Sequence, residues 1–207
     1  TPEADIALYN VGLNSFDTIS YSRFATSEYK SKGMKGFYLF GDKFGTGDPR
    51  INPNFEFASL TAAARAVAAI DGVITFIREQ PDSKDYEVML QPKDGSIWTI
   101  GYDHLVNVTV KKGDVVKAGD ILGTPATQNN GIPRFEIQIN KEMGGTSHIC
   151  PSILLHPSVK DSILASLTTM QDTWEKTVSL ELYDPSAQSP IGCLGKTSLT
   201  PQQAEGR

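Results

Sequence analysis

Short runs of apolar and polar residues, separated by turn signals, recur along most of the chain. Residues 51–58 and 134–139 alternate apolar and polar side chains after a loop, as half-buried strands do, and residues 86–90 and 96–102 have the composition of short strands. Asp-Gly pairs punctuate these runs, as expected of turns between strands. Short strands at near-regular spacing predict a mainly β protein, a sandwich or barrel, and argue against a parallel βαβ sheet.

Helical periodicity is convincing in one place only, residues 159–167, with a weak continuation toward Glu175. We therefore expect three parts. Residues 1–50 are an N-terminal extension that forms strands in places, residues 51–157 are the β domain, and residues 158–207 are a short helix followed by an irregular tail rich in Pro, Ser, Gln and Gly.

Residues 110–123 predict a hairpin punctuated by glycine. Gly113 and Gly119 stand where a tight turn requires positive φ or close backbone approach. The lysines of this segment are expected to point outward. Its buried face is expected to consist of the apolar residues Val108, Val110, Val115, Val116, Ile121 and Leu122.

Composition narrows the possible functions. The 207 residues are 39% hydrophobic and 9% aromatic, which suffices for a core. A net charge of −5 without a basic stripe argues against a nucleic-acid partner, and no apolar run is long enough to span a bilayer. The start at Thr1 suits either an exported protein whose signal peptide has been removed or a trimmed chain.

The two cysteines, Cys150 and Cys193, fit no zinc-binding spacing. In an exported protein an even count suggests a disulfide that ties the tail to the domain, and two unpaired buried thiols are the alternative. The nearby His148 and His156 are expected to be ordinary surface histidines, because a metal cluster with Cys150 would lack a fourth ligand.

Four segments in a fixed order carry a family resemblance. They are residues 69–74, the tetrapeptide Tyr102-Asp103-His104-Leu105, residues 110–123 and Phe135-Glu136-Ile137. Together they resemble the duplicated-hybrid-motif β fold of the lysostaphin/LytM-type peptidases, which cut peptide crosslinks in bacterial cell wall. The resemblance spans roughly residues 51–155. It implies a zinc ion held by two histidines and an aspartate, with further histidines for catalysis.

The positions that the resemblance assigns to zinc carry other residues here. Asn52 stands for the first metal histidine and Glu56 for the aspartate, while Ile132 and Arg134 replace the two histidines that precede Phe-Glu. An arginine is a fixed cation and cannot ligate a metal ion. We therefore expect no zinc cofactor, with His104 left as a catalytic relic.

Other roles are then expected for these residues. Arg134 is expected to pair with Glu56, either as a structural ion pair or as a recognition pair for a ligand, and His104 is expected to bond to a backbone group. Asp103 is expected to be a solvated neighbour. Tyr102, with Trp98 and Phe135, either lines a binding groove or is half-buried in the sheet. The predicted binding residues are Asn52, Glu56, Tyr102, His104 and Arg134.

These features favour a catalytically inactive LytM-like module, exported to the cell envelope or the extracellular space. It would bind cell-wall peptide, glycan or a partner protein, with peptidoglycan or a cell-envelope protein as partner. One alternative is an active zinc endopeptidase with atypical ligands. A second alternative is a structural component of a surface assembly. The sequence leaves the oligomeric state open.

Overall fold

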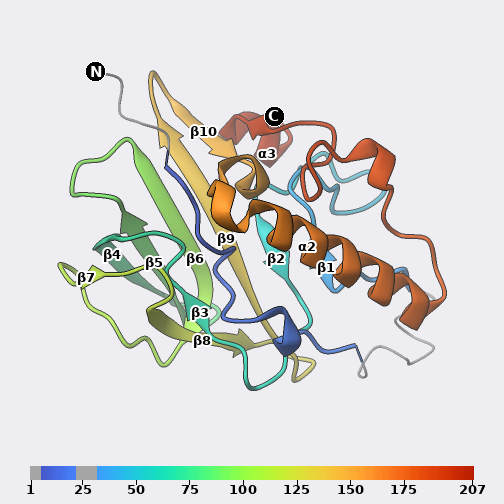
Figure 1. The fold of residues 1–207 in the computed structure, drawn as a ribbon, viewed down its shortest axis with the longest axis horizontal. Helices are drawn as coiled ribbons and strands as arrows, with labels where there is room; N and C mark the ends of the chain where they lie inside the picture. Colours follow the sequence, from blue (N-terminus) through green and yellow to red (C-terminus); the bar gives the residue numbers. More distant parts are fainter. Residues whose placement is uncertain (1–5, 22–31) are drawn as a thin grey trace.

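One large antiparallel sheet organises the chain in the computed structural model, which describes residues 6–21 and 32–207 (Figure 1). The terminal residue Thr1 lies outside the described residues. The expectation of a mainly β fold is confirmed, with a single large sheet. Its strands are β1 (Phe37–Tyr38), β2 (Phe55–Phe57), β3 (Ala66–Val67), β4 (Gly72–Gln80), β5 (Asp85–Gln91), β6 (Trp98–Val106), β7 (Val115–Val116), β8 (Ile121–Thr127), β9 (Pro133–Glu142), β10 (Thr146–Ile149) and β11 (Ser198–Leu199).

Strand β9 is the hub of the sheet, because it pairs with β2, β6, β8 and β10. The strand order is β1-β2-β9-β8-β6-β5-β4-β7, and β11 continues beyond β10. Along β9 the buried Phe135, Ile137 and Ile139 alternate with half-buried polar residues. One face of the sheet therefore carries the hydrophobic core and the other carries polar side chains.

Helix α2 (Pro157–Val178) runs across the sheet in front of β1 and β2 (Figure 1). It buries a stripe of residues at helical spacing: Ile163, Leu167, Met170, Gln171, Trp174 and Val178. The stripe continues past the predicted segment, so the helix is longer than the short one expected. The other helical segments whose bounds lie within the described residues are η1 (Phe16–Thr18), η3 (Pro151–Leu154), η4 (Pro185–Ala187) and α3 (Pro201–Glu205). No helix in the described ranges is long and apolar enough to cross a membrane.

The N-terminal segment and the tail share this core with the sheet. Leu8 forms a β-bridge with Leu155, and Leu13 forms another with Ala66. At the other end of the chain Cys193 is disulfide-bonded to Cys150. The tail then adds β11 to the sheet and ends in the short helix α3, so it has more regular structure than its composition suggests.

The predicted hairpin at residues 110–123 is wrong. Val115 and Val116 pair with β4, whereas β8 pairs with β3, β6 and β9. Gly113 and Gly119 do adopt positive φ, and the three lysines are exposed as predicted. Val115 and Ile121 are exposed, however. Val115 lies on the two-residue edge strand β7, which buries only Val116, and Ile121 is the first residue of β8.

Candidate functional site

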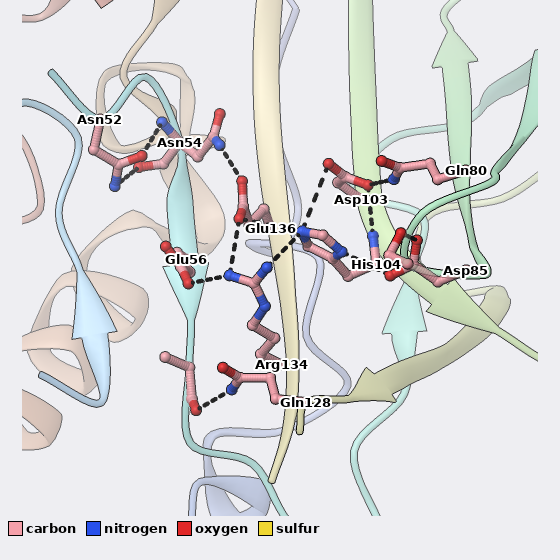
Figure 2. Close-up of polar contacts among 12 residues, drawn as sticks. Asn52, Asn54, Glu56, Gln80, Asp85, Asp103, His104, Gln128, Arg134 and Glu136 are labelled. Atoms are coloured by element: carbon pink, nitrogen blue, oxygen red, sulfur yellow. Dashed lines mark hydrogen bonds and ion pairs between the residues drawn. The ribbon is translucent and has the colours of Figure 1, made fainter. Parts of the chain in front are cut away.

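The polar face of the sheet gathers charged side chains from three strands. Arg134 and Glu136 project from β9, Glu56 from β2, and Asp103 and His104 from β6 (Figure 2). The register places Glu56 opposite Glu136, and Glu136 opposite Asp103, so these carboxylates lie across adjacent strands. Like charges on neighbouring strands repel one another unless cations lie between them.

A bulge in β6 turns His104 toward this face. Strand β5 advances two residues, from Tyr86 to Val88, while β6 advances three, from Tyr102 to Leu105. Asp103 and His104 therefore both lie on the polar side, between the buried Tyr102 and Leu105. His104 has a φ of 61°, a conformation that is uncommon for a side-chain-bearing residue and that recurs at functional sites.

Asp85 holds the ring of His104 from one side. Its Oδ2 lies 2.7 Å from Nδ1, and the carboxylate itself is almost fully buried. Asp85 is the first residue of β5, and Ser83 in the preceding turn donates a hydrogen bond to its other oxygen. The expectation that His104 bonds to a backbone group is therefore wrong: its partner is an acid.

Arg134 lies between Glu56 and His104. Its Nη1 donates to Glu56 Oε1 at 2.8 Å, and its Nη2 lies 2.9 Å from His104 Nε2 (Figure 2). Glu136 Oε1 is farther away, 3.5 Å from Nη1 and 3.6 Å from His104 Nε2. The predicted Glu56–Arg134 ion pair is thus present, and it links β2 to β9.

The pKa of His104 reflects its surroundings. Burial lowers this pKa, whereas the hydrogen bond to Glu136, the charge of Asp103 and the hydrogen bond to Asp85 raise it, with a result of about 9. A protonated Nε2 cannot accept the hydrogen bond from Arg134, so the contacts of Nε2 with Arg134 and with Glu136 exclude each other. We favour the protonated ring, because four carboxylates here face only one other cation, Arg134.

Two carboxylates of the cluster hold their protons more tightly than usual. Burial, and then the charge of Glu136, raise the pKa of Glu56, although Arg134 opposes the shift. Burial is also the main cause that raises the pKa of Asp103. Asp103 is bonded to Gln80 and to the backbone N–H of His104, so it is an integral member of the cluster and not the solvated neighbour expected.

Two predicted binding residues do not join the cluster. Asn52 is buried, and its amide bonds to the Leu39 carbonyl, from the segment after β1, and to the backbone of Asn54 in its own turn. Tyr102 is fully buried on the core face, where its hydroxyl accepts the Ala69 N–H at 2.7 Å. Trp98 and Phe135 are equally buried, which is more than the half-burial expected. Strand alternation explains this, because apolar neighbours place these aromatic rings on the core face.

Of the other histidines, His148 is 9% exposed and not at the surface as predicted. Its Nδ1 lies 2.7 Å from Asn140 Oδ1 on the adjacent strand β9. His156 is half-buried and caps helix α2 at its N-terminus. Among the described residues, no contact joins either histidine to the Arg134 cluster.

Sequence reasoning missed Asp85, Glu136 and Asn54 as members of the site. Glu136 had a usable signal, because it follows Arg134 by two residues on an alternating strand and so shares its face. Asp85 had none, since its approach to His104 depends on the bulge in β6. Asn54 donates a short hydrogen bond to Glu136 (Figure 2).

The residues at the zinc position of the resemblance do not fit a zinc ion. A zinc site needs neutral histidines and carboxylates that converge on one point. Here the side-chain amide of Asn52 donates to the Leu39 carbonyl, and the guanidinium of Arg134 contacts Glu56. A permanent cation in that place opposes a second one.

A different group of possible metal ligands is Asp85, Asp103 and His104, the one such group of three in the part of the chain that the structure describes. Asp85 approaches the ring at Nδ1, whereas Asp103 lies 3.8 Å from Nε2, on the other side of the ring. One ion cannot bind to both nitrogens. The Asp85 contact is better explained as a hydrogen bond that holds the imidazole, and the longer Asp103 contact as a charge interaction with the ring.

Open depressions lie on both sides of Arg134. One, of about 480 Å³, is bordered by Asp82, Asp85, His104 and residues 126–130, at the end of β8 and in the turn after it. The other, of about 220 Å³, is bordered by Tyr38, Glu56 and Gln128, and Arg134 borders both. Arg134 is therefore accessible from two open depressions, one on the side of His104 and one on the side of Glu56.

Comparison with known proteins gives one family match and several structural likenesses. Residues 56–148 match the sequence model of peptidase family M23. Among solved structures, lysostaphin is 21% identical with a TM-score of 0.44, over 51% of this chain and 43% of the lysostaphin chain. The catalytic domain of the prophage-encoded M23 protein EnpA from Enterococcus faecalis, solved as a point mutant, is 21% identical with a TM-score of 0.45. That match covers 57% of this chain and 91% of the EnpA domain.

A third structure, of LytU, is 24% identical with a TM-score of 0.43, over 52% of this chain and 74% of that chain. No curated protein matches at a significant level.

Proposed function

Because residues 56–148 of this chain are a peptidase family M23 domain, we propose that it acts by binding and not by hydrolysis. In this proposal Arg134 takes the place of the metal ion, and the former substrate groove holds a ligand. Cell-wall peptide is the ligand class that the family resemblance favours. A protein of the cell envelope is the other partner class to test.

The contact of Arg134 with Glu56 at 2.8 Å is the observation that carries this proposal. It pairs the residue at the histidine position with the residue at the aspartate position. An arginine cannot lower the pKa of a bound water molecule as zinc does, so the nucleophile of the family reaction has no source here. A guanidinium group binds carboxylates in a bidentate geometry, so a peptide carboxylate is a suitable ligand for Arg134.

The proposed location is outside the cytoplasm. The Cys150–Cys193 disulfide supports it, since such bonds persist in oxidising compartments. The family resemblance also supports it, because peptidases of this type act on cell wall, which lies outside the cytoplasm.

Zinc content and hydrolysis test the inactive state. Protein purified without chelators is expected to contain far less than one zinc per chain and to leave cell-wall peptides uncut. Arg134→His would put an imidazole beside Glu56 and His104, and we expect it to bind zinc more tightly than the wild type. Arg134→Gln is the matched control, with no gain. Stoichiometric zinc in the wild type, with cleavage, would show an active peptidase with atypical ligands.

Retention on purified peptidoglycan tests the ligand. We expect the wild type to be retained, and Arg134→Gln to be retained more weakly at equal fold stability. Stable self-association without any retention would instead favour a structural assembly component. Retention that is independent of Arg134 would place the binding surface elsewhere on the chain.

A further inference from the structure

Asn54 has a buried oxygen without a partner. The residue is 9% exposed, and its Oδ1 has no hydrogen bond among the residues that the structure describes. A buried acceptor without a donor costs free energy, and such groups are rare in native proteins. This atom therefore requires a donor that the chain itself does not provide.

The orientation of the amide follows from its neighbour. Nδ2 of Asn54 donates to Glu136 Oε2, and the reverse orientation would place two acceptors against each other. Figure 2 shows the amide nitrogen toward Glu136 and the oxygen directed away from it. The unpaired atom is therefore an acceptor, and it calls for a donor.

A small cavity of about 40 Å³ borders Asn54 on the polar face. This volume is enough for one small polar group. Gly101 contributes to the space, because a residue with a side chain there would fill part of it. The lining consists of Asn54, Glu87, Met89, Gly101, Asp103, Glu136, Gln138 and Asn140.

The charged residues of the lining are all acidic: Glu87, Asp103 and Glu136. Arg78 binds Glu87 at 2.8 Å from the exposed side, and Glu136 shares Arg134 with Glu56. Burial is the first cause that raises the pKa of Glu87, and the charge of Asp103 adds to it. Protonated His104 is a third cation near Asp103 and Glu136, but Asp85 and Glu56 also pair with His104 and Arg134, so five carboxylates outnumber three cations around the cavity.

We propose that this cavity binds the primary ammonium group of a ligand, with Asn54 Oδ1 and the carboxylates of Glu87, Asp103 and Glu136 as acceptors. An ammonium has three donors and one positive charge, which suits one orphan acceptor inside an acidic lining. Lysine-like side chains and free amino termini of peptides carry this group. For the identity of the ligand as a peptide, the inference rests on the proposed function.

A divalent cation fits less well. Glu87 and Glu136 do not belong to the group of side chains in the described ranges whose ligand atoms lie close enough together for one ion. Direct metal coordination needs such convergence at distances near 2–2.6 Å. Hydrogen bonds to an ammonium are longer and tolerate the wider arrangement.

A titration of the full chain with n-butylammonium tests the cavity, with n-butanol as the neutral probe of similar shape. Nuclear magnetic resonance follows the side-chain amide of Asn54. We expect butylammonium to shift these signals and butanol to leave them unchanged. Equal responses to both probes, or no response of Asn54, would overturn the inference; the second result would leave a buried water molecule as the donor.

The Arg78–Glu87 ion pair offers matched variants. Glu87→Gln is expected to weaken butylammonium binding about fivefold, the usual scale for one charge-assisted hydrogen bond that is partly exposed. Arg78→Gln removes the same ion pair and keeps the acceptor, so binding stays equal or tightens. Equal weakening by both variants would assign the effect to the lost ion pair and overturn the inference.

Gly101→Ala reduces the cavity without changing a charge. The added Cβ meets Met89 Sδ at 3.3 Å, a contact that a flexible thioether side chain accommodates. We expect weaker butylammonium binding at nearly unchanged stability. Unchanged binding in this variant would argue against the cavity as the site.

Peptides that differ only by lysine or norleucine separate this inference from the proposed function. If peptidoglycan is retained but lysine and norleucine peptides bind alike, the ammonium site fails and the binding module stands. If butylammonium binds but peptidoglycan is not retained, the cavity stands and the proposed function fails.

Discussion

His104 Nδ1 and Asp85 Oδ2 lie 2.7 Å apart, although the two residues come from different strands and 18 residues separate them in the printed sequence. The pair forms because the bulge in β6 turns His104 toward the start of β5. The buried acid holds the imidazole by its Nδ1 proton and favours the protonated ring. Nε2 then faces Arg134 and Glu136.

This arrangement predicts a high pKa for His104. The folded-state pKa of about 9 lies above the ordinary value of 6.5. The stabilisation from the protonated ring is therefore fully present below pH 6.5 and is lost as the pH rises toward 9. Asp85→Asn is expected to lower the pKa of His104 by about one unit or more. Titration of the imidazole signals by nuclear magnetic resonance measures it.

The stability of the Asp85→Asn variant at two pH values tests whether the protonated ring stabilises the fold. Asp85→Asn should destabilise the fold more at pH 6 than at pH 10, as measured by urea unfolding. An ordinary imidazole pKa in the wild type would instead show that Nε2 accepts its hydrogen bond from Arg134 in the dominant state.

Removal of Arg134 tests the ion pair with Glu56. The Glu56 side chain is 10% exposed, so Arg134→Ala leaves a buried carboxylate without its cation. We expect a loss of about 2–3 kcal/mol in the free energy of unfolding at pH 7. The loss should shrink at acidic pH, because Glu56, whose pKa is already raised, then takes up a proton. Denaturant unfolding at pH 7 and pH 5 measures both values.

The double variant Arg134→Ala/Glu56→Gln is the control. It removes the uncompensated charge, so it should recover part of the stability lost in Arg134→Ala. A double variant that is less stable than the single one would show that Glu56 is not desolvated in the folded protein.

The sequence predicts the polar face better than it predicts the contacts on it. Alternation along residues 134–139 places Arg134 and Glu136 on one face of the sheet. Glu56 and Arg134 stand at two zinc-ligand positions of the family resemblance, and this predicts their contact. Asp85 could not be predicted, because one extra residue in β6 reverses which side His104 faces. Such a bulge depends on pairing with β5, which local sequence does not encode.

Hydrophobicity misled where exposure depends on position in the sheet. Val115 and Ile121 are apolar, yet 75% and 49% exposed respectively, since one lies on the short edge strand β7 and the other at the start of β8. Tyr102 is predicted as a binding residue because it stands two residues before His104. Period-two alternation sends it to the core face instead.

The disulfide is expected to hold the tail against the domain. Cys150 and Cys193 are separated by 43 residues, a loop length for which the chain-entropy model gives about 4 kcal/mol of stabilisation. The Cys150→Ala/Cys193→Ala variant should unfold at a correspondingly lower urea concentration. Reduction of the disulfide in the wild type is the independent check. If neither the double variant nor reduction lowers the urea concentration at which the chain unfolds, the disulfide does not stabilise the fold.

Gly36 tests whether helix α2 is locked to the segment before β1. A Cβ at this position would lie 2.5 Å from two ring carbons of Trp174, a buried residue of α2. Because the rigid indole has no room to move in a packed core, Gly36→Ala should cost about 1–3 kcal/mol of unfolding free energy. The clash is with the indole, so the same substitution in a Trp174→Leu background should cost much less. A double-mutant cycle by urea unfolding measures the coupling between the two residues. Additive effects would mean that α2 adjusts freely and is not locked at this contact.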